Sequence, residues 1–147
     1  MASARQISDG ELPQLLDLYR MLNPDDPRVD PDVVRERWTE MRDDEHVVVV
    51  VVEHDDRLVA TCLLSMTPNL TRGARPFAVV ENVVTHEDYR GEGFGTQCVE
   101  AAVDVARERD CYKVMLLTGA DQAWKHDFYE ACGFDPEEKT GFVTYLS

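Results

Sequence analysis

The sequence predicts an α/β fold in which a mixed β-sheet carries helices on its faces. Short runs of β-branched residues alternate with segments whose apolar residues recur every three or four positions. A strand, a glycine-rich turn and a helix also follow one another directly in the second half of the chain. With 147 residues and no repeat or linker, the whole chain, 1–147, is expected to form a single domain.

The first third of the chain is expected to contain a short strand and two helices. Residues 4–7 read as the strand, and Ser8 or Asp9 is placed to cap a helix whose leucines keep helical spacing. A loop rich in proline follows at 23–31. A second helix then carries Trp38 on its apolar face.

The middle of the chain predicts a β-hairpin and a third long strand. The continuous run Val47 to Glu53 is typical of a strand buried on both faces. The polar residues 54–57 turn the chain into a strand from Leu58 to about Met66. A polar loop spans 68–76, and another strand runs from Phe77 to Thr85.

The last third predicts two helices and two strands. The helix after the glycine turn has an apolar face made by Cys98, Val99, Ala102, Val103 and Ala106. Tyr112 to Leu117 is expected to be a buried strand, and Asp121 to Cys132 a helix that Gly133 ends. Gly141 to Leu146 is expected to supply the last strand.

The charge balance is unusual, with 29 acidic residues against 15 basic ones and a net charge of -14. The acidic residues are dispersed, which favours a halophilic surface adapted to concentrated salt over a docking site for a cationic partner. The absence of a basic stripe argues against nucleic-acid binding.

Composition also bears on location and metal binding. The longest apolar run, Val47 to Val52, is too short to span a bilayer, and the first residues lack the apolar core of a signal peptide. A cytoplasmic location is therefore expected. The four cysteines show neither CxxC spacing nor clustering with histidine, so no metal site is predicted.

The segment from Arg90 to Thr96 is the most informative for function. Backbone N–H groups at the start of a helix are unpaired and carry partial positive charge, so this turn suits a phosphate or pyrophosphate. Glycines at 91, 93 and 95 allow close approach of a ligand. A tight turn that only packs helix on sheet is the alternative, and neither a Walker loop nor the GxGxxG fingerprint is present.

The stretch from Val83 to Gly95 resembles the acetyl-CoA-binding motif of the GNAT superfamily of N-acetyltransferases: a strand, then arginine or glutamine, two positions, glycine, one position, and glycine or alanine. Phe128 to Phe134 resembles the second hallmark, a helix that carries Phe-Tyr and ends in Gly-Phe. Within the superfamily, 81–84 and 111–114 are similar to glucosamine-6-phosphate N-acetyltransferases. The resemblance covers nearly the whole chain and implies a mixed, mostly antiparallel central sheet with helices on both faces.

The resemblance also implies roles for individual residues. Acetyl-CoA would be the cosubstrate, and Tyr129 would protonate its departing thiolate. The family often has asparagine where this chain has Gln122, which leaves the contact of Gln122 with the pantetheine arm open. Backbone groups beside the pantetheine arm would come from Val83, Val84 and Thr85, and the pyrophosphate would be held by Arg90, Gly91, Gly93, Phe94, Gly95 and Thr96.

Amine acetylation also needs a group that removes a proton from the nucleophile. Glu81 is the leading candidate for general base, because a carboxylate within an apolar strand is desolvated. An outward-facing Glu81 is the alternative. His86 is a lesser candidate, expected in a surface loop.

Three functions remain open: an acetyltransferase for a small-molecule amine, an acetyltransferase for a protein N-terminus or lysine, and a catalytically silent acyl-CoA sensor. Retention of the glycine turn and Tyr129 favours the first two. Arg72 and Arg75 suit an acceptor with a phosphate or carboxylate, whereas the acidic surface suits a polyamine. A homodimer is a further expectation from the family.

Overall fold

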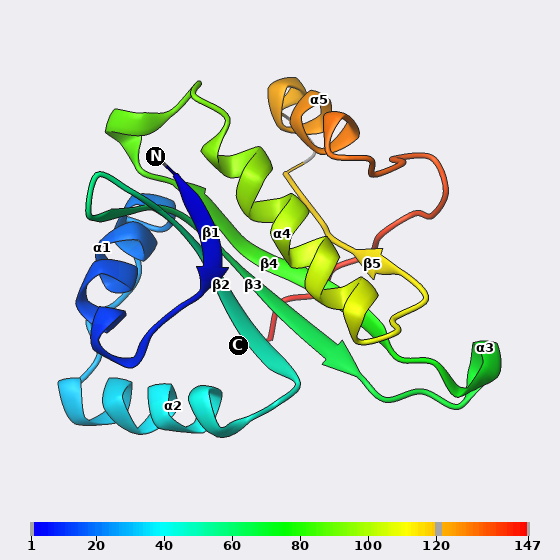
Figure 1. Ribbon diagram of the computed structural model, residues 1–147, viewed down its shortest axis with the longest axis horizontal. Coiled ribbons are helices and arrows are strands. Elements are labelled where there is room, and N and C mark those ends of the chain that lie inside the picture. Colours follow the sequence, from blue (N-terminus) through cyan, green and yellow to red (C-terminus); the bar gives the residue numbers. More distant parts are fainter. Residues whose placement is uncertain (1, 120–121, 147) are drawn as a thin grey trace. The chain divides into compact units, whose positions relative to one another are not determined.

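The computed structural model describes residues 2–119 and 122–146, which divide into two compact units, 1–115 and 116–147. Figure 1 shows the order of the elements along the chain. The second unit contains one helix, α5 (Ala123–Ala131), among its described residues. The elements of the first unit are β1 (Ser3–Gln6), the short 3-10 helix η1 (Asp9–Glu11), α1 (Leu12–Leu22), α2 (Pro31–Asp43), β2 (Val47–His54), β3 (Arg57–Thr67), α3 (Thr71–Ala74), β4 (Phe77–Thr85), the 3-10 helix η2 (Glu87–Tyr89), α4 (Phe94–Glu108) and β5 (Val114–Met115).

The strands of the first unit form one five-stranded sheet in the order β1-β2-β3-β4-β5. The first three pairings are antiparallel, and β4 pairs with β5 in parallel. A parallel neighbour needs a crossover connection, and α4 supplies it between β4 and β5. The predicted mixed, mostly antiparallel sheet is therefore confirmed.

Helices cover both faces of this sheet, as predicted. Leu18 of α1 and Trp38 of α2 belong to one buried cluster with Val51 of β2. Cys98 of α4 instead packs against Cys62 of β3, with the two Sγ atoms 3.6 Å apart, and Cys62 pairs with Val50, the neighbour of Val51. Successive side chains of a strand point to opposite faces, so α4 packs on the face opposite to α1 and α2.

Both helices on the first face begin with local signals that the sequence carries. The Ser8 N–H donates to the Glu11 carboxylate at 2.8 Å, which is half of a capping box ahead of α1. The Asp30 carboxylate accepts from the N–H of Asp32 at 2.8 Å, with Pro31 in the first position of α2. Ser8 is the N-cap of η1, whereas the leucine-bearing helix α1 has Glu11 as its N-cap, so the predicted cap lies one short helix ahead of α1.

Two predicted strands differ from the structure. The strand expected from Tyr112 to Leu117 is reduced to Val114 and Met115, which are half-buried. The segment 141–146, expected to form the last strand, is described without any regular secondary structure. A strand persists only where a neighbour pairs with its backbone, and an apolar run in the sequence does not reveal how far that pairing extends.

Two other elements differ in smaller ways. The polar loop 68–76 contains the short helix α3, whose residues Arg72 and Gly73 have left-handed angles. The helix predicted from Asp121 to Cys132 is α5, which ends at Ala131, while Asp121 lies outside the described residues. The expectation of one domain over 1–147 stays a prediction.

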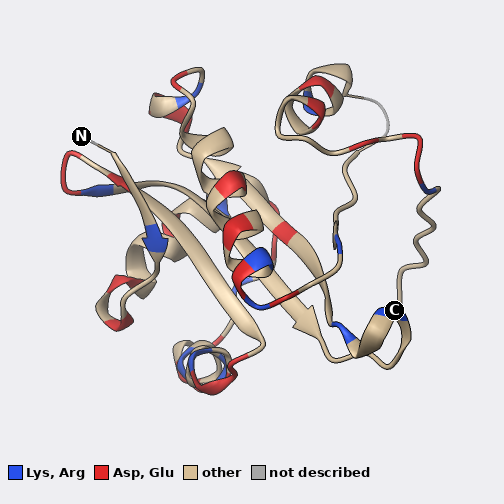
Figure 2. Cartoon of the chain, turned by 45° about the vertical axis from the view of Figure 1, so that its right-hand side comes forward, with Lys and Arg blue, Asp and Glu red and all other residues tan. Residues whose placement is uncertain are grey.

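Acidic residues are spread over helices, loops and turns of the chain (Figure 2). Many ion pairs join neighbours on exposed helix faces, such as Arg107 with Asp104 at 2.8 Å, and contribute little to stability. The excess of negative charge is therefore mostly unneutralised, and self-repulsion opposes the folded state in dilute buffer.

A halophilic surface predicts that added salt stabilises the fold. The melting temperature should rise between about 0.1 M and about 2 M KCl, because the screening length shortens from ~10 Å to a few Å. Thermal denaturation followed by circular dichroism measures it, with sucrose as a control that is excluded from the surface without screening charge. A melting temperature that stays flat or falls with KCl contradicts the halophilic interpretation.

Candidate functional site

The glycine turn between β4 and α4 has the geometry of an anion cradle. Gly91 and Gly93 have φ angles of +81° and +87°, which glycine adopts without strain. A Cβ atom built at either position meets no other atom within 4 Å, so the space beside the backbone is open. Gly93 is the N-cap of α4, and no described side chain caps it. The first amides of α4, from Phe94, Gly95 and Thr96, are thus left for a ligand.

The side chain of Phe94, the first residue of α4, packs against two neighbouring rings. The Phe94 ring is 8% exposed and lies 4.8 Å from the His54 ring and 6.3 Å from the Tyr89 ring, measured between centroids. Phe94 can therefore offer a ligand only its backbone amide, because its side chain packs against β2 and η2. Gly95 is buried, and Thr96 is half-buried.

His86 differs from its expected place in a surface loop. Its side chain is buried, and its ring lies 5.3 Å from the Tyr89 ring. The Nδ1 atom accepts a hydrogen bond from the N–H of Asp88 at 3.1 Å, so His86 caps η2. Its burial was not predictable, because His86 stands at the end of the apolar strand β4 and is followed directly by the charged residues Glu87 and Asp88.

Arg90 is exposed and ties the turn back to β4. Its Nε donates to the carbonyl oxygen of Thr85 at 3.3 Å. A single exposed hydrogen bond leaves the guanidinium able to reorient toward an anion in the turn.

A β-bulge interrupts β4 just before the predicted pantetheine-binding residues. Leu63 of β3 pairs with Glu81, and Thr61 pairs with Val84, so β4 has one residue more than β3 in this interval. Asn82 takes up the extra residue with φ +55°, a left-handed conformation that asparagine tolerates better than most residues. The only sequence signal was the polar pair at 81–82 within an otherwise apolar strand.

The bulge decides which face Glu81 occupies. Leu63 and Val84 both pack in the cluster beneath α1 and α2, and directly paired residues share a face. Glu81, opposite Leu63, therefore lies on the α1–α2 face together with Val84. Its side chain is exposed, which favours the outward-facing interpretation, and the apolar burial expected for a general base is absent among the described residues.

Tyr19 of α1 lies beside the bulge, a placement that the helical spacing of the sequence did not single out. Its hydroxyl oxygen is buried. Burial raises the pKa of Tyr19 to about 12, and the neighbouring Asn82 side chain opposes part of that rise. The phenol therefore stays protonated at neutral pH, next to the residue that forms the bulge.

The edge of β4 facing β5 is open beyond the bulge. Among the described residues, β5 pairs with β4 only at Ala78 and Val79. The His86 N–H donates to the Val59 carbonyl of β3 at 2.7 Å. In an antiparallel pair, alternate residues turn their N–H and C=O groups toward the partner, so Val84 faces β3 while Val83 and Thr85 face away. Of the three residues predicted beside the pantetheine arm, Val83 and Thr85 therefore turn their backbone groups away from β3, and the Thr85 carbonyl accepts the hydrogen bond from Arg90.

The second unit carries the other two predicted site residues. Gln122 is the exposed N-cap of α5, and Tyr129 lies in its last turn. The N–H groups of Gly133 and Phe134 donate to the carbonyls of Glu130 and Tyr129, each at 3.0 Å, and Gly133 has φ +95°. This pairing is a Schellman motif, in which the ring of Phe134 packs edge-on against that of Tyr129, with 6.3 Å between the ring centroids. The Gly-Phe ending of the motif thus has a structural role in stopping the helix.

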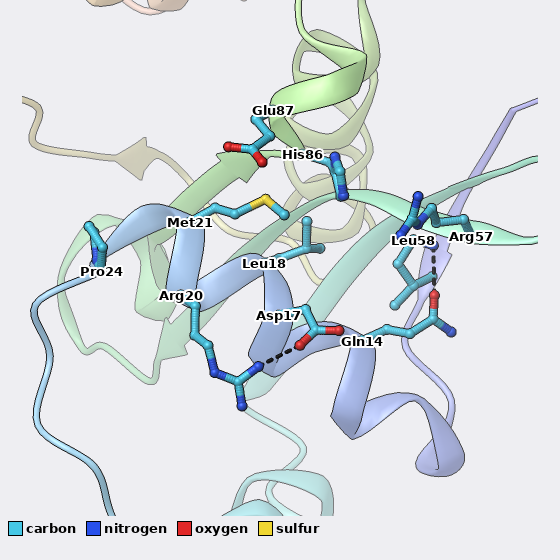
Figure 3. A pocket seen from close by; sticks show the side chains of 10 residues that line it. All are labelled: Gln14, Asp17, Leu18, Arg20, Met21, Pro24, Arg57, Leu58, His86 and Glu87. Atoms are coloured by element: carbon cyan, nitrogen blue, oxygen red, sulfur yellow. Dashed lines mark hydrogen bonds and ion pairs between the residues drawn. The ribbon is translucent and has the colours of Figure 1, made fainter.

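A pocket of about 570 Å³ opens on the α1 side of the sheet (Figure 3). The end of α1 and the residues after β4 line it, including Met21, His86 and Glu87. Gln14 anchors one wall, since its Oε1 accepts from the Leu58 N–H at 3.0 Å. The pocket lies on the same face as Glu81 and adjoins the segment leading into the glycine turn.

The described part of the chain contains no group of three or more His, Cys, Asp or Glu side chains able to hold a metal ion. Nor does any described helix combine the length and apolarity needed to cross a bilayer. Cys62, Cys98 and Cys111 are buried thiols, and burial raises the pKa of Cys111.

Comparison with known proteins agrees with these features. A family model described as the acetyltransferase (GNAT) family matches residues 13–134. The glucosamine 6-phosphate N-acetyltransferase of Trypanosoma brucei brucei is 34% identical over 83 residues, which are 56% of this chain and 54% of that protein. The chain therefore spans about half the length of that curated relative.

Solved structures extend the comparison to the whole chain. A protein of Agrobacterium tumefaciens str. C58 described as an acetyltransferase is 43% identical, with a TM-score of 0.92 over 98% of this chain and 99% of that one. AAC(6')-Iy, solved with a bisubstrate analogue containing coenzyme A, has a TM-score of 0.82 over 100% of this chain and 99% of that one. At 17% identity, the latter likeness concerns the fold alone.

Proposed function

The chain belongs to the acetyltransferase (GNAT) family, and we propose that it transfers the acetyl group of acetyl-CoA to a primary amine of a small molecule. The proposal depends most on one observation. The uncapped start of α4 follows β4, whose outer edge is open, through η2 and the glycine turn. The family uses acetyl-CoA as its cosubstrate, and these two features fit the two ends of that molecule.

In the proposed binding mode, two parts of acetyl-CoA contact two parts of the protein: the backbone amides at the start of α4 and the open edge of β4. The pyrophosphate accepts hydrogen bonds from the amides at the start of α4, with the guanidinium of Arg90 turned toward it. The pantetheine arm lies beside β4 and pairs with the backbone of Val83 and Thr85, as an added strand would. This places the thioester near the bulge at Asn82.

The proposed chemistry is direct attack of the amine on the thioester. The amine nitrogen forms a bond to the carbonyl carbon, the carbon–sulfur bond breaks, and the amine loses a proton. Glu81 accepts that proton, directly or through a water, since its exposed carboxylate lies next to the bulge. Tyr129 gives its proton to the coenzyme A thiolate. Gln122, at the start of the same helix, contacts the pantetheine amide.

The proposal is tested by thioester consumption with a panel of amines. We expect release of coenzyme A with a small-molecule amine such as glucosamine 6-phosphate, which the curated relatives are named for. A peptide N-terminus, a peptide lysine and spermidine complete the panel. Turnover only with the peptides would replace the small-molecule acceptor by a protein. Binding of acetyl-CoA without turnover on any amine would identify a silent acyl-CoA sensor.

A further inference from the structure

Two cationic side chains share one aromatic ring at the end of β4 farthest from the glycine turn. The guanidinium carbon of Arg72 lies 5.5 Å from the centroid of the Tyr112 ring, and the Nζ of Lys113 lies 5.3 Å from it. The Lys113 Nζ also lies 5.7 Å from the centroid of the Phe77 ring. We call Arg72, Tyr112 and Lys113 the cation cluster.

Neither cation of this cluster has a carboxylate partner within ion-pair distance among the described residues. Nearby Arg75 differs, because it pairs with the Asp110 carboxylate at 3.3 Å and donates to the carbonyl of Cys111 at 3.2 Å. Two like charges against one ring repel each other, and an anion between them would relieve that repulsion.

The backbone that carries Arg72 is strained. Arg72 and Ala74 have φ angles of +55° and +59°, and Gly73 between them has +75°. These angles are unfavourable for a residue that has a Cβ, and such strain gathers at binding sites. These strained residues lie where the loop brings the Arg72 side chain to the Tyr112 ring.

The cluster and Glu81 lie at opposite ends of one row of side chains. Phe77, Val79 and Glu81 alternate along β4 onto the same face, before the bulge changes the register. Val79 is half-buried and Glu81 is exposed, so this row is accessible on the described unit. Glu81 lies four residue positions after Phe77, a span of about 13 Å at ~3.3 Å per residue.

We propose that the cation cluster binds an anionic group, a phosphate ester or a carboxylate, on the far end of the amine acceptor. The inference rests on the proposed function, because Glu81 and the bulge are taken as the place where the amine reacts. The acceptor is then an extended small molecule whose amine and anion are separated by roughly the length of the row. The cluster offsets the repulsion that the acidic chain exerts on such an acceptor.

Binding of the anion is measured without turnover. Inorganic phosphate is titrated at constant ionic strength into the chain saturated with coenzyme A, so that the glycine turn is already occupied. We expect phosphate to shift the NMR resonances of the Tyr112 ring, and the shift to disappear in Arg72→Gln/Lys113→Gln. The control Arg28→Gln/Lys139→Gln removes the same charge from exposed positions elsewhere and should keep the shift. A Tyr112 ring that ignores phosphate overturns the anion site.

The acceptor role is measured with linear amines whose extended length matches the row: 8-aminooctyl phosphate, 10-aminodecanoate and neutral 8-aminooctanol. The wild type should prefer an anionic acceptor at least tenfold in kcat/KM, and the two anionic probes distinguish phosphate from carboxylate. The double variant should lose this preference while its kcat/KM for 8-aminooctanol is unchanged. An unaltered preference in the double variant overturns the acceptor role. If no amine is acetylated, the proposed function fails, and the phosphate titration alone decides whether the anion site exists.

Discussion

Gly93→Asn should abolish measurable acetyl-CoA binding while leaving the fold in place. Asparagine tolerates the left-handed angle of +87° at this position, so the backbone cost is limited. Its side chain, however, fills the open space beside the amides that the pyrophosphate would occupy. We expect the dissociation constant to rise at least 100-fold, or about 2.7 kcal/mol, by isothermal titration calorimetry.

Two further variants separate the causes of that loss. Gly73→Asn places the same side chain at a φ of +75° with equally open surroundings, and it should bind acetyl-CoA like the wild type. Arg90→Ala removes one charge-assisted contact and should weaken binding about ten- to hundredfold. Normal acetyl-CoA binding by Gly93→Asn would mean that the turn only packs α4 on the sheet, and the functional assignment would fail with it.

Tyr129→Phe should lower kcat by about 10²-fold while acetyl-CoA affinity and stability stay nearly unchanged. The substitution keeps the ring contacts with Phe128 and Phe134, at 4.9 and 6.3 Å, and removes only the hydroxyl. A thiolate leaving without a proton donor is a poorer leaving group, so the loss belongs to the chemical step. Single-turnover acetyl transfer measures that step separately from product release.

The pH dependence distinguishes an acid from a packing residue. A basic limb in the wild-type pH–rate profile should disappear in Tyr129→Phe, because the group that titrates has been removed. Tyr145→Phe, at an exposed position in the same unit, is the matched control and should behave as wild type. Equal single-turnover rates for Tyr129→Phe and wild type across pH would make Tyr129 a packing residue.

The fold was predictable wherever local pattern and tertiary context agree. The runs 47–53 and 77–85 match β2 and β4 to within a residue, because a buried central strand needs continuous apolar side chains. The same reasoning was wrong for 141–146, where residues typical of a strand have no described strand beside them. Strand pairing is a property of two segments, and one segment's composition cannot supply it.

The candidate site was predictable in its turn but not in its bulge. The glycines at 91 and 93 take the left-handed angles that their spacing indicated. The shift of register at Asn82 puts Glu81 and Val84 on one face of the sheet, and it depends on how β4 pairs with β3. Its only trace in the sequence is the polar pair 81–82 within an otherwise apolar strand. The cation cluster was equally hidden, because Arg72 and Tyr112 are far apart in sequence and meet through the loop before β4.

The central claim, transfer of acetyl from acetyl-CoA to an amine, is tested most directly by product analysis in a single reaction. Acetyl-CoA and an excess of glucosamine 6-phosphate or 8-aminooctyl phosphate are incubated with the chain, and free thiol and acetylated amine are both quantified, the latter by mass spectrometry. We predict equal amounts of coenzyme A and acetamide product, formed much faster than without protein, and lost in Gly93→Asn. Coenzyme A release without any acetylated amine, or no release with any amine of the panel, would contradict the account.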